Sequence, residues 1–118
     1  MKRRIYTDEE IEILKRNVMV KEIKYKREIV YEPIFKMWSI MMRYEYPEYT
    51  AKEIFEKAGF NTMILHPDLP RRRISRWIYN YKKFGIKYFL PENEDYTIKD
   101  SFKKHLLKVV LERLDKYE

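Results

Sequence analysis

The strongest structural signal in this sequence lies in residues 69–85, LPRRRISRWIYNYKKFG. Apolar residues recur in it every three or four positions, which places them on one side of an α-helix. They are Ile74, Trp77, Ile78 and Tyr81, with Phe84 extending the same side. Pro70 suits the first turn of a helix and Gly85 suits the residue just past its end. The segment therefore predicts an amphipathic helix with a defined start, a buried side and a defined end.

The other sides of this helix carry cationic and hydrogen-bonding side chains, and no acidic residue occurs between Asp68 and Glu92. Such a surface is suited to the phosphates and base edges of DNA. We therefore predict that DNA is contacted by Arg71, Arg72, Arg73, Ser75, Arg76, Tyr79, Asn80, Lys82, Lys83 and Lys87.

The excess of basic over acidic side chains is concentrated in this one segment. Residues 1–68 carry 13 basic and 12 acidic side chains, residues 69–91 carry 7 and none, and residues 92–118 carry 6 and 7. The formal net charge of +7 is therefore that of the predicted helix and its immediate flank. A solvated basic surface without a partner would explain the same pattern, as would a protein-interaction module whose basic helix binds an acidic partner.

Length and composition bound the class of protein. The chain has 118 residues, which suffice for one domain or for one domain with an appendage. It has no cysteine, which excludes disulfides and cysteine-rich zinc modules and fits a reducing compartment. The longest nearly apolar run, residues 37–42, is far shorter than a membrane helix, and the acidic residues 8–10 are unlike the apolar region of a signal peptide. We expect a cytoplasmic protein without membrane association.

Two capping signals predict further helices. Thr7 with Glu10, and Thr50 with Glu53, each have the spacing of a capping box, in which a hydroxyl and a carboxylate satisfy backbone N–H groups at a helix start. The predicted helices cover about residues 8–17 and residues 51–58.

Residues 18–44 carry two different patterns. Apolar residues nearly alternate with polar ones over residues 18–31, which indicates a short strand or an irregular linker. Pro33 then opens a helix to about residue 44, and we interpret its three methionines as core residues. The whole chain has only two glycines, which argues against an all-β fold with many tight turns and against a Gly-rich phosphate loop.

The last part of the chain predicts one more helix, capped by Thr97. Leu107, Val110, Leu114 and Tyr117 form an apolar seam on it, and the helix is too apolar to stand alone. The seam spans fewer than two heptads, which is too short to indicate a coiled coil. Packing on its own domain and pairing with a second subunit, as in a homodimer, both explain this pattern.

One further pattern links these elements to a known family. Residues 50–60, TAKEIFEKAGF, are followed by Trp77 inside the Arg-rich helix, and upstream lie the acidic helix, the extended segment and Phe35-Lys36. Over about residues 6–88 the sequence resembles helix-turn-helix proteins related to the small first-reading-frame subunits of insertion-sequence transposases.

This resemblance implies a mostly α fold, with a helix-turn-helix DNA-binding domain in residues 1–90 and a C-terminal packing or dimerisation helix in residues 91–118. Residues 51–58 would form the supporting helix and residues 70–84 would contain the recognition helix. The connection between them, residues 60–69, has ten residues, whereas a standard turn has about 3 to 4. A short helix in residues 61–66 is therefore the alternative recognition element.

The function expected from the residues and the resemblance together is binding of double-stranded DNA, as a transcription regulator or a transposase-type recognition subunit. Residues 71–73 and Arg76 are candidates for guanine contacts, and Asn80 is a candidate for an adenine contact. The phosphate contacts are assigned to Ser75, Tyr79, Lys82, Lys83 and Lys87.

No chemistry beyond binding is expected. The two histidines, His66 and His105, lie 39 positions apart, and neither has a partner at helical spacing that would complete a metal site. The three serines lie in no nucleophile motif. In the transposases the catalytic carboxylates belong to a separate domain, so we predict no catalysis, no metal and no cofactor.

Overall fold

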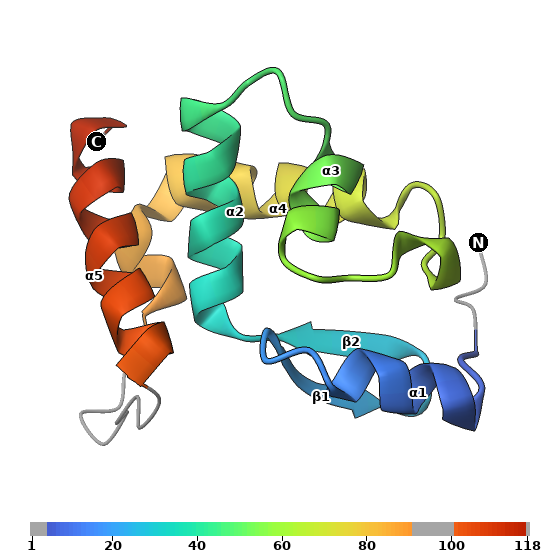
Figure 1. The fold of residues 1–118 in the computed structure, drawn as a ribbon. Coiled ribbons are helices and arrows are strands. Elements are labelled where there is room, and N and C mark those ends of the chain that lie inside the picture. Colours follow the sequence, from blue (N-terminus) through green and yellow to red (C-terminus); the bar gives the residue numbers. More distant parts are fainter. Residues whose placement is uncertain (1–4, 91–100, 118) are drawn as a thin grey trace.

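The computed structural model describes residues 5–90 and 101–117, and this part of the chain is mostly helical, as predicted. Figure 1 shows a small antiparallel hairpin at the lower edge of the molecule, with most of the helices above it. The helices and strands are α1 (Asp8–Lys15), β1 (Val20–Lys24), β2 (Glu28–Tyr31), α2 (Pro33–Glu45), α3 (Ala51–Lys57), α4 (Leu69–Phe84) and α5 (Ser101–Leu114). Three short 3-10 turns are η1 (Thr62–Ile64), η2 (Ile86–Phe89) and η3 (Asp115–Tyr117). None of the described helices is both long and apolar enough to cross a membrane.

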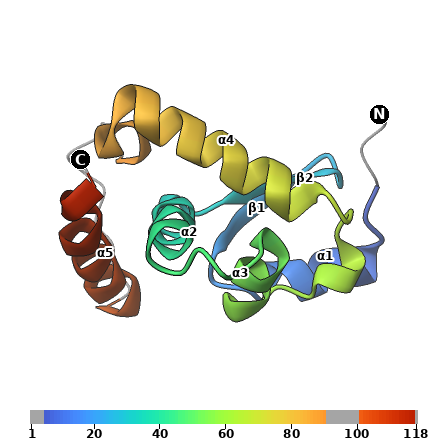
Figure 2. The same cartoon turned by 90° about the horizontal axis from the view of Figure 1, so that it is seen from above.

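Helix α2 lies at the centre, because α3, α4 and α5 all pack against it (Figure 2). Its methionines, Met37, Met41 and Met42, are buried, which confirms their assignment to the core.

A cluster of aromatic rings joins α2, α3 and α4. The Phe35 ring lies 5.1 Å from that of Phe55 and 5.6 Å from that of Trp77, and all three side chains are buried. The Tyr31 ring of β2 lies 5.3 Å from Trp77 and ties the hairpin to the same core. Because α4 contributes Trp77 to this cluster, the orientation of the helix about its own axis is fixed.

Both predicted capping boxes are present. The Glu10 amide donates to Thr7 Oγ1 at 3.1 Å and the Thr7 amide donates to Glu10 Oε1 at 2.9 Å. At the start of α3 the two corresponding distances, between Thr50 and Glu53, are both 3.1 Å. These local bonds explain why both helix starts are readable from the sequence.

Residues 18–31 form the β1–β2 hairpin, so the strand interpretation of the alternating pattern is confirmed and the irregular linker is wrong. Val20 lies opposite Tyr31 and Lys24 opposite Glu28, with an irregularity between Val20 and Glu22. Tyr25 and Lys26, at the turn, both have positive φ, 55° and 57°. These angles suit the tight turn of a two-stranded hairpin.

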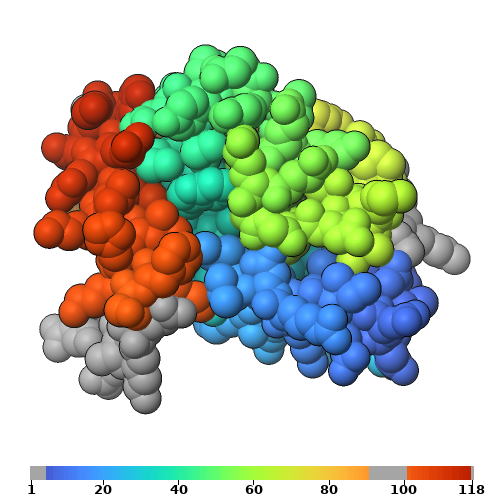
Figure 3. Space-filling view, in the orientation of Figure 1, coloured from blue at the N-terminus to red at the C-terminus, as the bar shows by residue number. Residues whose placement is uncertain are grey.

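Helix α5 packs on α2 within the same chain. This agrees with the first of the two alternatives for the apolar seam, packing on its own domain. Val110 and Leu114 of the predicted seam are fully buried there. Arg113 also forms an ion pair with Glu45 of α2 at 2.6 Å. Figure 3 shows α5 as a ridge along one side of the molecule. The predicted cap at Thr97 lies outside the described residues.

Candidate nucleic-acid interface

Helix α4 has two opposite stripes with the same spacing. One stripe consists of buried residues spaced by four, three and four positions, and it faces the core: Pro70, Ile74, Trp77 and Tyr81. The other has the same spacing and is exposed: Arg72, Arg76, Tyr79 and Lys83. We call this second set the basic stripe. Figure 2 shows α4 at the edge of the molecule, with α2 and α3 on one side of it.

The structure places most of the predicted contact residues in solvent. Eight are exposed, namely Arg71, Arg72, Ser75, Arg76, Tyr79, Lys82, Lys83 and Lys87. Arg73 and Asn80 are half-buried, because they lie where the exposed side of α4 meets the packed side. The ten residues therefore share one helix and its flank, but Arg73 and Asn80 do not belong to its outer side.

Asp68 lies beside two arginines in the first turn of α4. Asp68 precedes the helix without a side-chain capping bond, and its carboxylate lies 3.7 Å from Arg71 and 3.8 Å from Arg72. Ion pairs of this length between exposed side chains contribute little stability. A phosphate can therefore replace Asp68 beside these two guanidinium groups without a large loss of ion-pair energy.

The rest of the basic surface is not neutralised by the described part of the chain. Within residues 5–90 and 101–117, no ion pair to a carboxylate is formed by Arg76, Lys82, Lys83 or Lys87. Like charges at this density repel one another, so the surface gains most from an anionic ligand that spans several of them.

Two further cations extend this surface beyond α4, and sequence reasoning missed both. Burial lowers the pKa of Lys36 on α2, and the neighbouring charges of Arg73 and Lys21 on β1 lower the pKa further. Lys36 is half-buried. Because the charges of Arg73 and Lys21 act on it, three cations from three separate elements lie near one another, at what we call one corner of the surface. The balanced charge of residues 1–68 gave no local signal for this, because only the fold brings the three together.

Arg73 also lies beside a buried tyrosine. Burial raises the pKa of the Tyr31 hydroxyl, and the positive charge of Arg73 opposes that rise. The hydroxyl has no partner at ordinary hydrogen-bond geometry within the described residues. Arg73 is thus held near the hairpin, at the edge of the basic surface.

The connection between α3 and α4 contains only one short turn. The alternative recognition element predicted in residues 61–66 is reduced to η1, a 3-10 turn of three residues. Phe60 and Leu65 on either side of it are buried and anchor the connection to the core. The His66 ring accepts a hydrogen bond from the Asp68 amide at 3.1 Å, so this histidine supports the start of α4.

Phe84 departs from the prediction. It was expected on the buried side of α4, but its side chain is 53% exposed. The helix ends at Gly85, whose φ of +77° turns the chain back into η2. Phe84 therefore lies past the last core contact of the helix and stacks on Tyr88, with ring centroids 5.2 Å apart and an angle of 14°.

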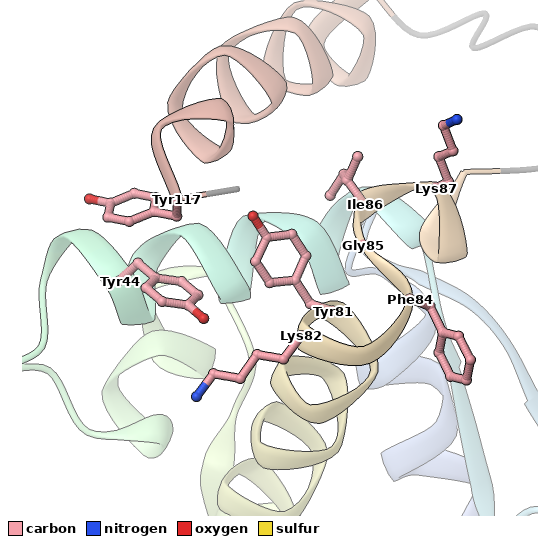
Figure 4. A pocket seen from close by; sticks show the side chains of 8 residues that line it. All are labelled: Tyr44, Tyr81, Lys82, Phe84, Gly85, Ile86, Lys87 and Tyr117. Carbon is pink, nitrogen blue, oxygen red and sulfur yellow. The ribbon is translucent and has the colours of Figure 1, made fainter.

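An open pocket of about 540 Å³ lies beside the C-terminal end of α4 (Figure 4). Tyr44 and Tyr117 stack on one side of it, with ring centroids 4.9 Å apart, and the Tyr81 hydroxyl donates to the Leu114 carbonyl at 3.3 Å. Figure 4 shows Lys82 and Lys87 pointing in different directions. Because its polar groups do not converge on one point, the pocket lacks the usual form of a small-molecule site.

Neither metal ligation nor relatives add to this description. Within the described residues, no group of three or more His, Cys, Asp or Glu side chains lies close enough together to hold a metal ion. Comparison of the chain with protein-family models, with curated proteins and with solved structures gives no match. The function is therefore inferred from the geometry of α4 and its surroundings.

Proposed function

We propose that this protein binds double-stranded DNA through the exposed side of α4, without catalysis. The observation that carries the proposal is the pair of opposite stripes on this helix: one locks it into the core and the other presents aligned cations to solvent. An α-helix with its side chains is about 10–12 Å across, and the major groove of B-DNA is about 12 Å wide.

The positions of the side chains suggest their roles. Arg72 and Arg76 lie on the basic stripe near the start of α4, the part of a recognition helix that contacts base edges. An arginine there can donate two hydrogen bonds to a guanine. Phosphate contacts are proposed for residues around this pair: Arg71, Ser75, Tyr79, Lys82, Lys83 and Lys87.

The corner formed by Lys21, Lys36 and Arg73 fits the phosphates at one edge of the groove. Arg73 is then a phosphate contact in place of the guanine contact first expected, because its side chain is half-buried beside Lys36. Asn80 remains a candidate for an adenine contact only at the margin of the interface, since it is half-buried as well.

In this proposal α3 is the supporting helix of a helix-turn-helix with an extended connection, since it packs on both α2 and α4. The protein would act in the cytoplasm as a transcription regulator or a transposase-type recognition subunit. A homodimer, as the family resemblance implies, would place two copies of α4 on one duplex and raise the affinity through effective concentration.

The second candidate is a protein-interaction module whose basic helix binds an acidic partner. The arginines beside Asp68 already pair with a carboxylate in this structure, so they suit an acidic partner as well as a phosphate. The two candidates differ in the shape of the ligand, because only DNA binding requires the helix to enter a groove.

The direct test is the double substitution Arg72→Ala/Arg76→Ala, measured by fluorescence anisotropy on a labelled duplex that was selected from a random pool for tight binding to the wild type. Its control is Lys104→Ala/Lys108→Ala, which removes two exposed charges from α5. We expect the α4 variant to lose at least about 30-fold in affinity, because each contact contributes about 1–3 kcal/mol. Its helix content, measured by circular dichroism, should not change, and the control should bind like the wild type. Equal losses in the two variants would contradict a defined interface on α4.

A further inference from the structure

Three large aromatic side chains gather at the C-terminal end of α4 in contact with solvent. Tyr79 is 61% exposed, and Phe84 and Tyr88 are each 53% exposed. Contiguous exposed apolar groups with a polar rim are typical of interaction sites. We call these three residues and Lys83 the aromatic patch.

The rings of the patch are held in place. Phe84 and Tyr88 are nearly parallel, and Tyr88 also packs edge-on against Phe89, with ring centroids 5.2 Å apart and an angle of 81°. Phe89 is buried, so it anchors the pair to the core. Figure 4 shows Phe84, which also lines the open pocket, pointing away from the stacked rings of Tyr44 and Tyr117. A preformed ring surface loses little conformational freedom when a ligand stacks on it.

A cation lies within the same group. The Lys83 ammonium is 5.7 Å from the Tyr79 ring centroid and 5.4 Å from that of Phe84. Aromatic rings interleaved with cations are typical of surfaces that bind unpaired nucleotides, whose bases stack on the rings while their phosphates pair with the cations.

The position of the patch along α4 separates it from the paired bases. Arg72 and Lys83 are 11 residues apart, so they lie about 16 Å apart along the helix axis, which is more than the major groove width of about 12 Å. If Arg72 contacts the floor of the groove, as in the proposed function, Lys83, Phe84 and Tyr88 lie beyond the groove edge. Tyr79 is 7 residues from Arg72, about 10 Å along the axis, so it lies at that edge, where it can also contact a phosphate. Paired bases are stacked inside the duplex, so they offer no free ring face there.

We propose that the aromatic patch binds an unpaired base adjoining the duplex that α4 contacts, so that the ligand of this protein is a junction between double-stranded and single-stranded DNA. This inference rests on the proposed function. Lys83 would exchange its ring contacts for the phosphate of the unpaired nucleotide.

The test compares three DNA ligands that share one duplex. The first has a blunt end, the second a four-nucleotide thymine overhang and the third an overhang of four abasic sites. Both overhangs are tested on each strand in turn. We expect the thymine overhang to bind about 5- to 150-fold more tightly than the other two, the range for one stacked base. The abasic overhang carries the same phosphates, so it separates stacking from charge.

The matched variants are Tyr88→Ala and Tyr25→Ala. Tyr25 is an exposed aromatic residue at the hairpin turn, 86% accessible, and it is not part of the patch. We expect Tyr88→Ala to lose the gain from the thymine overhang and to keep the affinity for the blunt duplex, whereas Tyr25→Ala keeps both. Tyr88→Phe, which preserves the ring, should behave like the wild type.

The two proposals fail in different ways. A wild-type protein that does not bind the blunt duplex contradicts the proposed function. Binding to the blunt duplex with no difference between the thymine and the abasic overhang contradicts this inference alone. A Tyr88→Ala variant that keeps the overhang gain but shifts from dimer to monomer in sedimentation would show that the patch binds a second copy of this chain, which also overturns the inference.

Discussion

Lys36 is the residue whose environment most clearly connects the fold with the proposed function. Its side chain is half-buried, and burial together with the nearby charges of Arg73 and Lys21 lowers its pKa. A lysine whose pKa is lowered in the folded state destabilises the fold below that pKa, and the penalty disappears as the pH rises through it. A phosphate placed in the same corner would remove most of the penalty.

The substitution Lys36→Met keeps the length of the side chain and removes its charge. We expect thermal stability to rise at neutral pH and this gain to shrink at alkaline pH, because the wild-type lysine then loses its proton. Duplex affinity should fall, and the salt dependence of binding should weaken by about one phosphate contact. Lys104→Met, at an exposed position on α5, is the control. A variant with reduced stability and unchanged DNA binding would assign Lys36 to the fold alone.

At the scale of single residues, the sequence predicted which side of a helix is buried better than it predicted which residues of different elements meet. Trp77 was expected in the core and is buried against Phe35, because its position follows from helical periodicity alone. Phe84 has the same spacing, yet the turn at Gly85 leaves it in solvent. The meeting of Lys36 with Arg73 depends on how α2 and α4 pack, which no local pattern encodes.

At the scale of secondary structure, the capping box of α3 gives a pH-dependent prediction. The hydrogen bonds from the Thr50 amide and hydroxyl, followed by the smaller effect of Lys57, lower the pKa of Glu53. A carboxylate whose pKa is lowered in the folded state stabilises the fold above its unfolded pKa, and this contribution is lost as the pH falls through the folded value.

We therefore expect Glu53→Gln to be less stable than the wild type at neutral pH and the difference to shrink below the ordinary Glu53 pKa of 4.5. The measurement is urea unfolding at several pH values. Glu9→Gln, an exposed acid in the first turn of α1, is the control. A stability difference that does not vary with pH would show that the carboxylate of Glu53 does not support the helix start.

The elements themselves were largely predictable, since capping boxes, proline positions and periodicity are local features. The hairpin was predicted less completely. Alternation indicated an extended segment but did not reveal two strands, because the turn at Tyr25 and Lys26 lacks the glycine that usually marks a hairpin turn. The end of α4 at Gly85 was visible, but the return of η2 beside Phe84 was not.

At the scale of the whole molecule, α5 completes the core that positions α4. Leu114 is fully buried, and its carbonyl accepts a hydrogen bond from the Tyr81 hydroxyl. Tyr117, in the turn that follows, stacks on Tyr44. Sequence periodicity showed that α5 must be covered, but it left open whether by its own chain or by another. The side of α5 that contains Val110 and Leu114 is covered by α2 of the same chain.

We expect Leu114→Ala to cost about 2–5 kcal/mol of the free energy of unfolding, the range for large-to-small substitutions at buried positions. Lys108→Ala, at an exposed position of the same helix, should change stability by less than about 0.5 kcal/mol. Denaturant unfolding at low protein concentration checks both. A negligible cost for Leu114→Ala would mean that α5 does not pack on α2 in solution.

The measurement that tests the DNA proposal most directly is the affinity of the wild-type protein for duplex DNA as a function of salt concentration. If α4 and its flanks neutralise about five phosphates, the logarithm of the affinity falls against the logarithm of the salt concentration with a slope of about −4 to −5. An affinity that does not depend on salt would contradict the account.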